Sequence, residues 1–346
     1  MFNFSKKLAF GIDLSDASLK MVQLKNDTGK LSISNFVKID VPEGLVEEGI
    51  IKKEDKLIPI FKEALNNSKR DSFKGKGVVC SLPEEKVFVR VIKIPKMKEE
   101  ELSEAIKWEA EAHIPLSIDD VYFDWSVIKT KEDSNNSNIL ITAAPKDIVD
   151  KYVSFLKKIN LIPIAFEPES FSVIRSLIKK DDLIPTIIID LGATGTNFVI
   201  FSGSDIRFTS HISISGNLLN NKIAEKMKVS LKKANEFKIK YGLEDKENDL
   251  GVESIIDDLV NQIKDYIVFY NDQIIDANEQ KKDISRIMLC GGDSYLLGLP
   301  ENLSSKLNLP VELGNPLINI DDKGEKSLKK MIVYTTAIGL ALREVI

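Results

Sequence analysis

The stretch Ile188-Ile-Asp-Leu-Gly-Ala-Thr-Gly-Thr-Asn197 repeats a pattern that occurs earlier in the chain, in Gly11-Ile-Asp-Leu-Ser-Asp-Ala-Ser-Leu-Lys20. In each copy an apolar strand ends in an aspartate, and a turn of small residues reverses the chain into a second strand. The two aspartates, Asp13 and Asp190, are 177 residues apart (190 − 13), about half of the 346-residue chain. The repeat therefore predicts two related halves, each with a sheet that contains this hairpin.

Both turns are suited to binding phosphate. Small residues let backbone N–H groups approach an oxyanion, and concave arrays of such groups bind phosphate without a lysine-bearing loop. Two such turns facing one another would clamp a polyphosphate, and Asp13 and Asp190 would hold a hydrated Mg²⁺, which accepts few protein carboxylates. A plain β-hairpin turn is the alternative for either copy alone. The expected phosphate-binding residues are Ser15, Ser18, Lys20, Gly192, Ala193, Thr194, Gly195 and Asn197.

A third motif, Gly291-Gly292-Asp293-Ser294, follows an apolar run that has the pattern of a buried strand. By itself it is explained by a simple strand-to-helix turn. Placed in order after the two hairpins, it predicts a third element of one nucleotide site. The chain contains no Gly-x-x-x-x-Gly-Lys-Ser/Thr sequence, which excludes a P-loop.

The composition is that of an ordinary globular protein, with 43% hydrophobic and 29% charged residues. With a formal net charge of −5, the chain lacks the excess of basic residues that is typical of nucleic-acid binders, so no nucleic-acid partner is expected. The two cysteines, Cys80 and Cys290, and the two histidines, His113 and His211, have no metal-ligand spacing, so we expect reduced, buried thiols and no zinc site. The N-terminal segment is too short and too polar to contain the apolar region of a signal peptide. No apolar run in the sequence approaches the roughly 18 residues of a membrane span. A cytosolic protein is therefore expected.

Hydrophobic periodicity and Gly or Pro punctuation predict alternating strands and helices, as in an α/β protein. Strands are expected at 8–14, 19–24, 31–39, 77–82, 87–94, 121–129, 139–143, 186–190, 198–201 and 284–290. Helices are expected at 56–66, 99–113, 145–159, 218–227, 231–241, 253–277 and 327–344, with a loop at the polar run 131–138. The strand, helix, strands and helix of 87–159 would form a small inserted subdomain.

The order of the three motifs resembles the actin-like ATPase superfamily, with 8–24 as the first phosphate motif, 186–201 as the second and 287–300 as the adenosine motif. The resemblance implies an actin-like (ribonuclease H-like) two-lobed α/β fold that binds ATP and Mg²⁺. It also implies that Glu167 orients the attacking water and acts with Asp190 in catalysis; a carboxylate at the start of the following helix is the alternative for Glu167. The further nucleotide contacts that it implies are Gly216, Lys238, Gly291, Gly292, Asp293 and Ser294.

Within that superfamily the chain resembles the PilM family of type IV pilus assembly proteins, which are related to the division protein FtsA. The most specific stretch is Trp108-Glu-Ala-Glu-Ala-His-Ile-Pro115. Without the family, this stretch would be only part of an amphipathic helix packing on strands. The other matching stretches are Phe10-Gly-Ile-Asp13, Ser81-Leu-Pro83, Glu99–Lys107, Thr142-Ala-Ala-Pro-Lys146, Gly291-Gly292 and Thr336-Ala-Ile-Gly-Leu-Ala-Leu-Arg343.

The family resemblance implies a cytosolic ATP-binding scaffold with slow or no ATP hydrolysis. Its partner would be the short cytosolic N-terminal tail of the membrane protein PilN, held in a groove between the first core subdomain and the inserted one. Membrane association would be indirect, at the inner face of the cytoplasmic membrane, and pilus motor ATPases are a further partner class. Two alternatives stay open: an FtsA-like division scaffold, for which a basic amphipathic tail is expected, and a sugar or acetate kinase, which needs a substrate cleft with an acidic base.

The resemblance divides the chain into four subdomains: 1A (1–84 with 160–185 and 326–346), the inserted FtsA-type 1C (85–159), 2A (186–215 with 284–325) and 2B (216–283). Three positions depart from the family pattern. Ser15 stands where a glycine is usual, Asp16 adds a carboxylate beside the phosphate turn, and Asn235 replaces a glutamate that commonly meets the ribose. Asp16 must therefore point away from the phosphates or weaken their binding.

Overall fold

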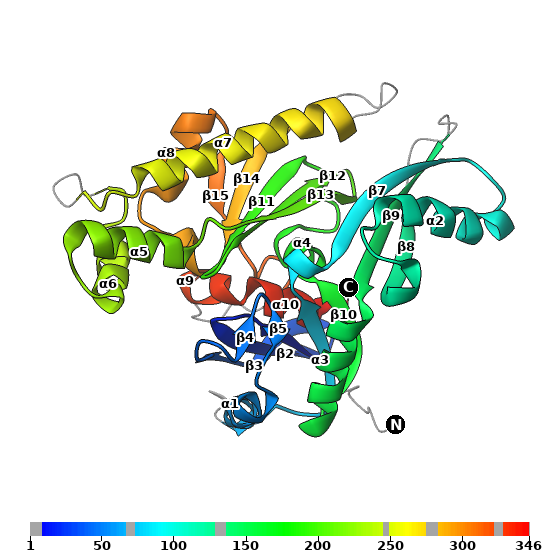
Figure 1. Cartoon of the computed structure of the whole chain (residues 1–346), viewed down its shortest axis with the longest axis horizontal. Coiled ribbons are helices and arrows are strands. Elements are labelled where there is room, and N and C mark those ends of the chain that lie inside the picture. The colour runs from blue at the N-terminus through cyan, green and yellow to red at the C-terminus, as the bar shows by residue number, and fades with distance from the viewer. Residues whose placement is uncertain are drawn as a thin grey trace. The chain divides into compact units, whose positions relative to one another are not determined.

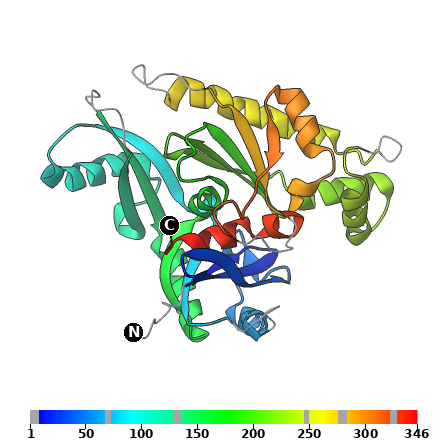
Figure 2. The same cartoon turned by 180° about the vertical axis from the view of Figure 1, so that it is seen from behind.

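The computed structural model describes residues 9–66, 73–128, 136–244, 249–274, 283–321 and 328–345. The chain divides into two compact units: the first contains the described residues up to 180 and those from 315 onward, and the second contains 181–314. Each unit is built on one five-stranded mixed sheet with helices packed against it (Figure 1 and, from behind, Figure 2). The predicted α/β class is confirmed.

The sheet of the first unit has the strand order β10-β6-β1-β2-β3. An antiparallel meander is formed by β1 (Phe10–Leu14), β2 (Ser18–Asp27) and β3 (Lys30–Asp40). On the other side of β1, β6 (Gly77–Leu82) and β10 (Ile162–Pro168) add in parallel. The three parallel strands therefore end at one edge of the sheet, and in open α/β sheets ligands bind at this carboxyl edge.

The sheet of the second unit has the strand order β13-β12-β11-β14-β15. Its meander is formed by β11 (Thr186–Leu191), β12 (Thr196–Ser202) and β13 (Asp205–Ile212). Next to β11, β14 (Arg286–Cys290) and β15 (Val311–Leu313) add in parallel. The two sheets thus share one order and one set of strand directions, which confirms the predicted internal repeat.

Helices cover both faces of the first sheet. On one face, α1 (Glu54–Asn66) and α3 (Lys146–Lys158) pack into the same hydrophobic core as β1. On the other face, α10 (Thr335–Leu342) lies against β1 and β2. A Cβ atom at Gly11 would lie 2.2 Å from the carbonyl oxygen of Ala337, so the glycine of the first motif allows α10 to approach the sheet this closely.

The inserted part of the first unit is a three-stranded antiparallel sheet covered by one helix. Its strands are β7 (Phe88–Pro95), β9 (Asn136–Pro145) and β8 (Val121–Ile128), in that order. The helix, α2 (Glu99–His113), has the bounds expected from the sequence and packs on the sheet through Ile106.

Helix α3 was expected to belong to the inserted subdomain, which the sequence division ends at residue 159. Its side chains Tyr152 and Phe155 instead pack in the core of the first sheet. By this packing the inserted part ends near Pro145, where β9 gives way to α3.

In the second unit one hydrophobic core joins the sheet to its helices. The helices are α5 (Gly216–Met227), α6 (Leu231–Tyr241), α7 (Glu253–Phe269) and α8 (Leu299–Leu307). Figure 1 shows α7, in yellow, lying along this sheet. A short π-helix, Tyr270–Ile274, continues α7.

Of the strands in the two five-stranded sheets, β10, β13 and β15 are not predicted by the sequence pattern. All three lie at the edge of a sheet. An edge strand is stabilised by pairing with a neighbour that already exists, and its own side chains pack less regularly. Its hydrophobic pattern is therefore a weak signal.

Three further expectations need correction. The loop expected at 131–138 is wrong for Asn136–Asn138, which pair with β7, so cross-strand hydrogen bonding overrides the polar composition there. The C-terminal helix expected at 327–344 is broken into α9 (Leu328–Met331), the 3₁₀ turn Ile332–Tyr334 and α10. Within the described part of the helix expected at 253–277, α7 is α-helical and Tyr270–Ile274 is a π-helix.

Some expectations concern residues outside those that the structure describes: Leu8 and Lys129 at strand ends, the loop residues 131–135, and residues 275–277 and 327 of two helices. Among the described residues, no helix has both the length and the apolar character that crossing a bilayer requires.

Candidate nucleotide site

Asp13 lies at the carboxyl end of β1 and is 4% exposed. It stands opposite Lys20 in the β1–β2 register, and Lys20 Nζ is 2.8 Å from Asp13 Oδ2. The ammonium compensates a buried carboxylate that would otherwise be costly. Burial, reinforced by the Asp13 charge, raises the pKa of the Cys80 thiol on neighbouring β6 far above its usual range, so this thiol stays protonated. Cys80 and Cys290 are both free and buried, as expected.

The turn after β1 is closed by its two serines. The backbone N–H of Ser15 donates to the Ser18 carbonyl at 2.9 Å, and the N–H of Ser18 donates to Ser15 Oγ at 3.2 Å. The Ser15 hydroxyl also donates to the Ser18 carbonyl, at 3.2 Å. A glycine here has no hydroxyl, so Ser15 contributes turn hydrogen bonds that the usual family residue cannot make.

Asp16 is bound by another part of the first unit. Its Oδ2 and Oδ1 accept the backbone N–H groups of Glu48 and Gly49, each at 2.8 Å. These two residues form the turn between β4 (Val46–Glu47) and β5 (Ile50–Ile51), and both have positive φ, 50° and 68°, as such a two-residue hairpin turn requires. The Asp16 carboxylate is therefore directed to this turn and bound by it, and its effect on phosphate binding stays a prediction.

The β4–β5 turn is in contact with the segment that leads into the insertion. Lys86 Nζ is 2.5 Å from Glu48 Oε2, and this hydrogen bond and charge lower the pKa of Glu48. Tyr152 on α3 donates its hydroxyl to the Gly49 carbonyl at 2.6 Å. A Cβ atom at Gly49 would lie 2.3 Å from Pro83 Cβ. The first phosphate turn is therefore connected, through Asp16 and this turn, to the residues just before β7.

The turn after β11 is held by backbone groups. The N–H of Gly192 donates to the Gly195 carbonyl at 2.9 Å. Two more bonds dock the turn on the start of α5: the N–H of Gly216 donates to the Gly192 carbonyl at 3.0 Å, and that of Asn217 to the Ala193 carbonyl at 2.9 Å. The start of α5, with Gly216, is thus part of the second turn.

Asp190 stands opposite Asn197 in the β11–β12 register, one residue before the end of the strand, as the aspartate of the first hairpin does. The Asn197 Oδ1 atom lies 2.7 Å from Nδ1 of His211 on β13. A Cβ atom at Gly195 would lie 2.2 Å from His211 Cε1, so only glycine leaves room for the imidazole. Thr194 is exposed at the tip of the turn.

The third motif lies directly beside the second hairpin. Gly291 has a φ of 88°, and a Cβ atom there would lie 2.3 Å from Asp190 Oδ1. The Ser294 hydroxyl donates to the Gly291 carbonyl at 2.8 Å and closes the 3₁₀ turn Gly292–Tyr295. A Cβ atom at Gly292 would meet no described heavy atom within 4 Å, so the backbone is open on that side. The structure therefore brings Asp190 and this motif together, and a ligand can approach the motif closely.

Lys238 joins α6 to the third motif. Its buried ammonium lies 2.5 Å from Asp293 Oδ1 and donates to the Gly216 carbonyl at 3.3 Å. A Cβ atom at Gly216 would lie 1.9 Å from Asp293 Oδ2, so a glycine is needed at the start of α5. Three residues that are far apart in sequence, all expected in the site, are thus in mutual contact.

Glu167 is 3% exposed at the end of β10, and two arginines bind it. Arg175, on α4 (Glu169–Leu177), donates from Nη1 to Oε1 at 2.6 Å and from Nη2 to Oε2 at 3.0 Å, and Arg343 Nη1 is 2.5 Å from Oε2. Two roles were expected for Glu167: orienting the attacking water, or binding N–H groups at the start of the following helix. Neither role describes these contacts, since the carboxylate contacts guanidinium groups. Its contacts in the structure give it a structural role, and a role in orienting water stays a prediction.

The carboxyl edge of the first sheet carries polar residues that sequence reasoning missed. Buried Glu84 accepts the backbone N–H of Ser170, near the start of α4, at 3.0 Å. The hydroxyls of Ser81 and Ser170 are buried and have no hydrogen-bond partner within the described part of the chain. Ser81 and Arg343 lie in stretches that carry the family resemblance, so the sequence contained a signal for these two residues. No local pattern indicated Glu84.

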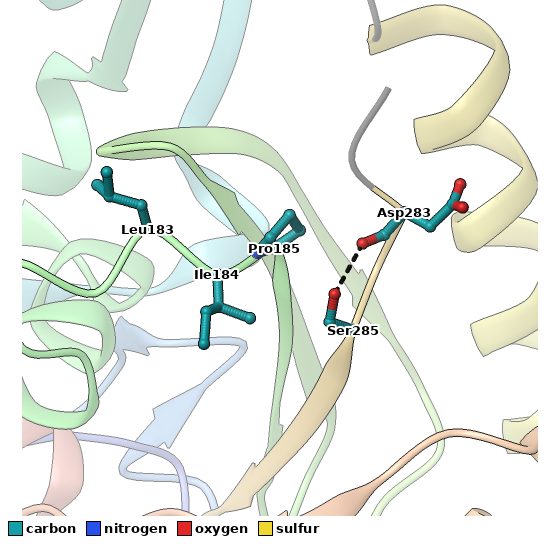
Figure 3. Close-up of a pocket in the computed structure, with 5 residues that line it drawn as sticks. All are labelled: Leu183, Ile184, Pro185, Asp283 and Ser285. Carbon is teal, nitrogen blue, oxygen red and sulfur yellow. Dashed lines mark hydrogen bonds between the residues drawn. The ribbon is translucent and has the colours of Figure 1, made fainter. Parts of the chain in front are cut away.

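A surface pocket of about 500 Å³ in the second unit is not part of this site (Figure 3). It lies just before the amino ends of β11 and β14, whereas the glycine turn and the third motif follow their carboxyl ends. Its residues are Leu183, Ile184, Pro185, Asp283 and Ser285.

The described residues contain no cluster of three or more His, Cys, Asp or Glu side chains that could enclose a metal ion. The candidate magnesium ligands are single carboxylates, Asp13 in the first unit and Asp190 in the second. Carboxylate oxygens are donors that Mg²⁺ accepts, and Mg²⁺ takes only one or two protein carboxylates while it keeps most of its waters.

The strand order of both sheets, the two aspartate-bearing hairpins and the glycine motif after β14 define a protein of the actin-like ATPase fold. Solved structures agree with this class. A chain of a PilM-PilN type IV pilus biogenesis complex is 24% identical, with a TM-score of 0.82 and 98% of each chain covered. The ethanolamine utilization protein EutJ from Carboxydothermus hydrogenoformans is 15% identical, with a TM-score of 0.56, over 96% of this chain and 89% of that one. MreB 5 of Spiroplasma citri, bound to AMPPNP, is 13% identical, with a TM-score of 0.56, over 98% and 96%.

The family model of the type IV pilus assembly protein PilM matches residues 11–345. The chain therefore belongs to the family of type IV pilus assembly proteins PilM. The resemblance seen in the sequence is confirmed, and assembly of the pilus is favoured over the division-scaffold and kinase alternatives.

Proposed function

We propose that the chain is an ATP-binding scaffold of type IV pilus assembly. The observation that carries the nucleotide part is the repeat: two sheets of identical order each present a hairpin whose first strand ends in an aspartate. A fold with two such hairpins can bind a polyphosphate between small-residue turns. Support also comes from the similar fold of MreB 5, which was solved with AMPPNP.

In this proposal Asp13 and Asp190 hold Mg²⁺ through water. The phosphates contact Ser15, Ser18 and Lys20 on one side, and Gly192, Ala193, Thr194, Gly195 and Asn197 on the other. The nucleoside end is met by Gly216, Lys238, Gly291, Gly292, Asp293 and Ser294. The mutual contact of Lys238, Asp293 and Gly216, and the open backbone at Gly292, support this division of roles.

Slow or absent hydrolysis is part of the proposal. A water-orienting carboxylate needs a free oxygen within hydrogen-bond reach of the attacking water. Both oxygens of Glu167 accept hydrogen bonds from arginine side chains, and the Arg175 pair is bidentate. A carboxylate held in this way is poorly available to position water.

The proposed partner is the cytosolic N-terminal tail of PilN, which would recruit the chain to the inner face of the cytoplasmic membrane. The similar chain in the PilM-PilN complex supports this partner. The tail would bind between the first sheet and the inserted part. The contact from Asp16 through the β4–β5 turn to Pro83 and Lys86 gives nucleotide and tail a physical route for coupling.

Titration of the full chain with ATP and Mg²⁺ by calorimetry tests the site assignment. Asp190→Ala should weaken ATP binding and change the affinity for a synthetic PilN tail peptide, because it removes one proposed metal contact. Asp258→Ala, an exposed position on α7, is the matched control and should leave both unchanged. At a hundredfold excess of ATP over Kd, binding should stabilise the unmodified chain by roughly 2.7 kcal/mol. An ATP titration of Asp190→Ala identical to that of the unmodified chain would refute the site.

A further inference from the structure

One row of side chains crosses three strands of the second sheet beside its glycine turn. Asp190 on β11 stands opposite Asn197 on β12, and Asn197 stands opposite His211 on β13. Because directly opposite residues of antiparallel neighbours face the same side of a sheet, the three side chains share one face. Asp190 and Asn197 have roles in the proposed nucleotide site, whereas His211 lies outside every motif of the sequence.

The imidazole of His211 is in contact on two sides. Its Nδ1 atom lies 2.7 Å from Asn197 Oδ1. Its Cε1–Nε2 edge lies over the backbone of Gly195, where a Cβ atom would be 2.2 Å from Cε1 and 2.5 Å from Nε2. An amide oxygen only accepts hydrogen bonds, so Nδ1 is the donor and carries a proton. This bond therefore fixes the tautomer of the neutral ring as well as its position.

The equivalent row of the first sheet is built differently. There Asp13 stands opposite Lys20, and Lys20 stands opposite Lys38. Lys20 contacts Asp13 directly, and the Lys38 ammonium is 3.5 Å from Asp40. An ammonium group is a donor in every orientation, whereas an amide presents either its NH2 group or its oxygen, depending on its rotation. The middle residue of the row therefore needs an orienting neighbour in the second unit and not in the first.

We propose that His211 is a positioning residue of the nucleotide site, which holds the Asn197 amide in the orientation that donates to phosphate. With Oδ1 turned to the imidazole, the NH2 group lies on the side away from β13, which is the side of β11 and Asp190. An NH2 group donates to phosphate oxygens, whereas an amide oxygen turned to them would repel them. The inference rests on the proposed nucleotide site and adds a residue that acts on the ligand through Asn197.

Loss of the imidazole should weaken ATP binding and leave the fold intact. His211 is exposed, so its removal does not disturb the hydrophobic core of its unit. His211→Ala should raise the dissociation constant for ATP with Mg²⁺ about two- to tenfold, the usual effect of one hydrogen bond. Calorimetry on the full chain measures this change. His113→Ala removes the other histidine, on α2 of the first unit, and is the matched control that should bind ATP normally.

A conservative variant separates the hydrogen bond from the charge and bulk of the imidazole. In His211→Asn the side-chain NH2 group can take the place of Nδ1, so a donor to Asn197 Oδ1 remains. ATP affinity should return to within about twofold of that of the unmodified chain. His211→Leu fills space without a donor and should stay as weak as His211→Ala. If His211→Asn binds no better than His211→Leu, the role in positioning is wrong.

A double-mutant cycle shows whether His211 acts through Asn197. Asn197→Ala removes the proposed phosphate contact itself and should weaken ATP binding at least as much as His211→Ala does. The double variant should bind ATP no more weakly than Asn197→Ala alone, because the imidazole then has no amide to hold. Additive losses would overturn the proposal, since they would mean that His211 acts on the nucleotide independently of Asn197.

The tautomer of His211 gives a readout that needs no nucleotide. The chain has two histidines, so His113→Ala leaves His211 as the only imidazole. The ¹⁵N chemical shifts of its neutral ring should place the proton on Nδ1, and Asn197→Ala should abolish this preference. A proton found on Nε2 would overturn the proposal whether or not ATP binds.

The same measurements distinguish this inference from the nucleotide site on which it rests. If the unmodified chain binds ATP and Asp190→Ala weakens binding, the site is supported. Unchanged affinity in His211→Ala would then refute the role of His211 alone. A chain that does not bind ATP would overturn both the site and the role of His211.

Discussion

The hairpins of the two units have the same topology, but they are held in different ways. In the β1–β2 hairpin, side chains reinforce the backbone bond between Ser15 and Ser18: Lys20 pairs with Asp13, the Ser15 hydroxyl also donates to the Ser18 carbonyl, and Asp16 binds the β4–β5 turn. Each of these contacts depends on a particular polar group.

In the β11–β12 hairpin, backbone groups hold the turn. Gly192 bonds to Gly195 within the turn and to Gly216 at the start of α5. Glycines at 195, 216 and 291 allow neighbouring atoms to come closer than any Cβ atom would permit. The first hairpin should therefore be sensitive to losing a side chain, and the second to gaining one.

Gly291→Ala should have the largest effect. The added Cβ atom would meet Asp190 Oδ1 at 2.3 Å, at a φ of 88° that side chains rarely adopt. Strain and overlap together should destabilise the second unit by about 3 kcal/mol. Urea denaturation followed by far-ultraviolet circular dichroism measures this. Gly292→Ala is the control, since its Cβ atom would meet open space; equal losses in both variants would contradict the close-packed backbone.

Lys20→Met should have the second-largest effect on stability. It leaves the Asp13 carboxylate buried without its ammonium partner, and since Lys20 is partly exposed the loss of unfolding free energy should be about 2 kcal/mol. Lys25→Met breaks the exposed pair with Asp27 and should cost less than about 0.5 kcal/mol. Similar values for the two variants would show that burial of Asp13 does not matter to the first hairpin.

Asp16→Asn should have a smaller effect on stability, about 1 kcal/mol, because the amide can accept only one of the two backbone N–H groups. Its effect on ATP affinity has a diagnostic sign. If Asp16 positions the turn, as its contacts indicate, affinity falls in the variant; calorimetry measures the change. A rise in affinity would mean that the carboxylate repels the phosphates instead.

Glu48→Gln should have the smallest effect, and it should depend on pH. Lys86 lowers the pKa of Glu48, so the ionised pair contributes stability above the ordinary glutamate pKa of about 4.3 and loses it as the pH falls through the lowered value. The thermal midpoints of the two proteins should differ at pH 7 and converge in acid. A difference that persists at low pH would show that the pair plays no part.

The site was predictable where its signals were local. Asp13, Asp190 and the glycine motif at 291 stand where the sequence placed them, at the ends of buried strands. Edge strands such as β10 were missed because they are stabilised by pairing with neighbours rather than by their own pattern. Glu84 was missed for a similar reason, since its contact at Ser170 lies far along the chain.

The sequence by itself determined the internal repeat, the α/β class and the family, because strand, turn and motif patterns are properties of short segments. Only the tertiary structure decided which partner each charged group has. Glu167 is bound by Arg343, Asp16 by the turn at Glu48 and Gly49, and Lys238 by Asp293. These groups come together through the folding of distant segments, and an ion pair or hydrogen bond exists only where that folding brings its atoms within reach.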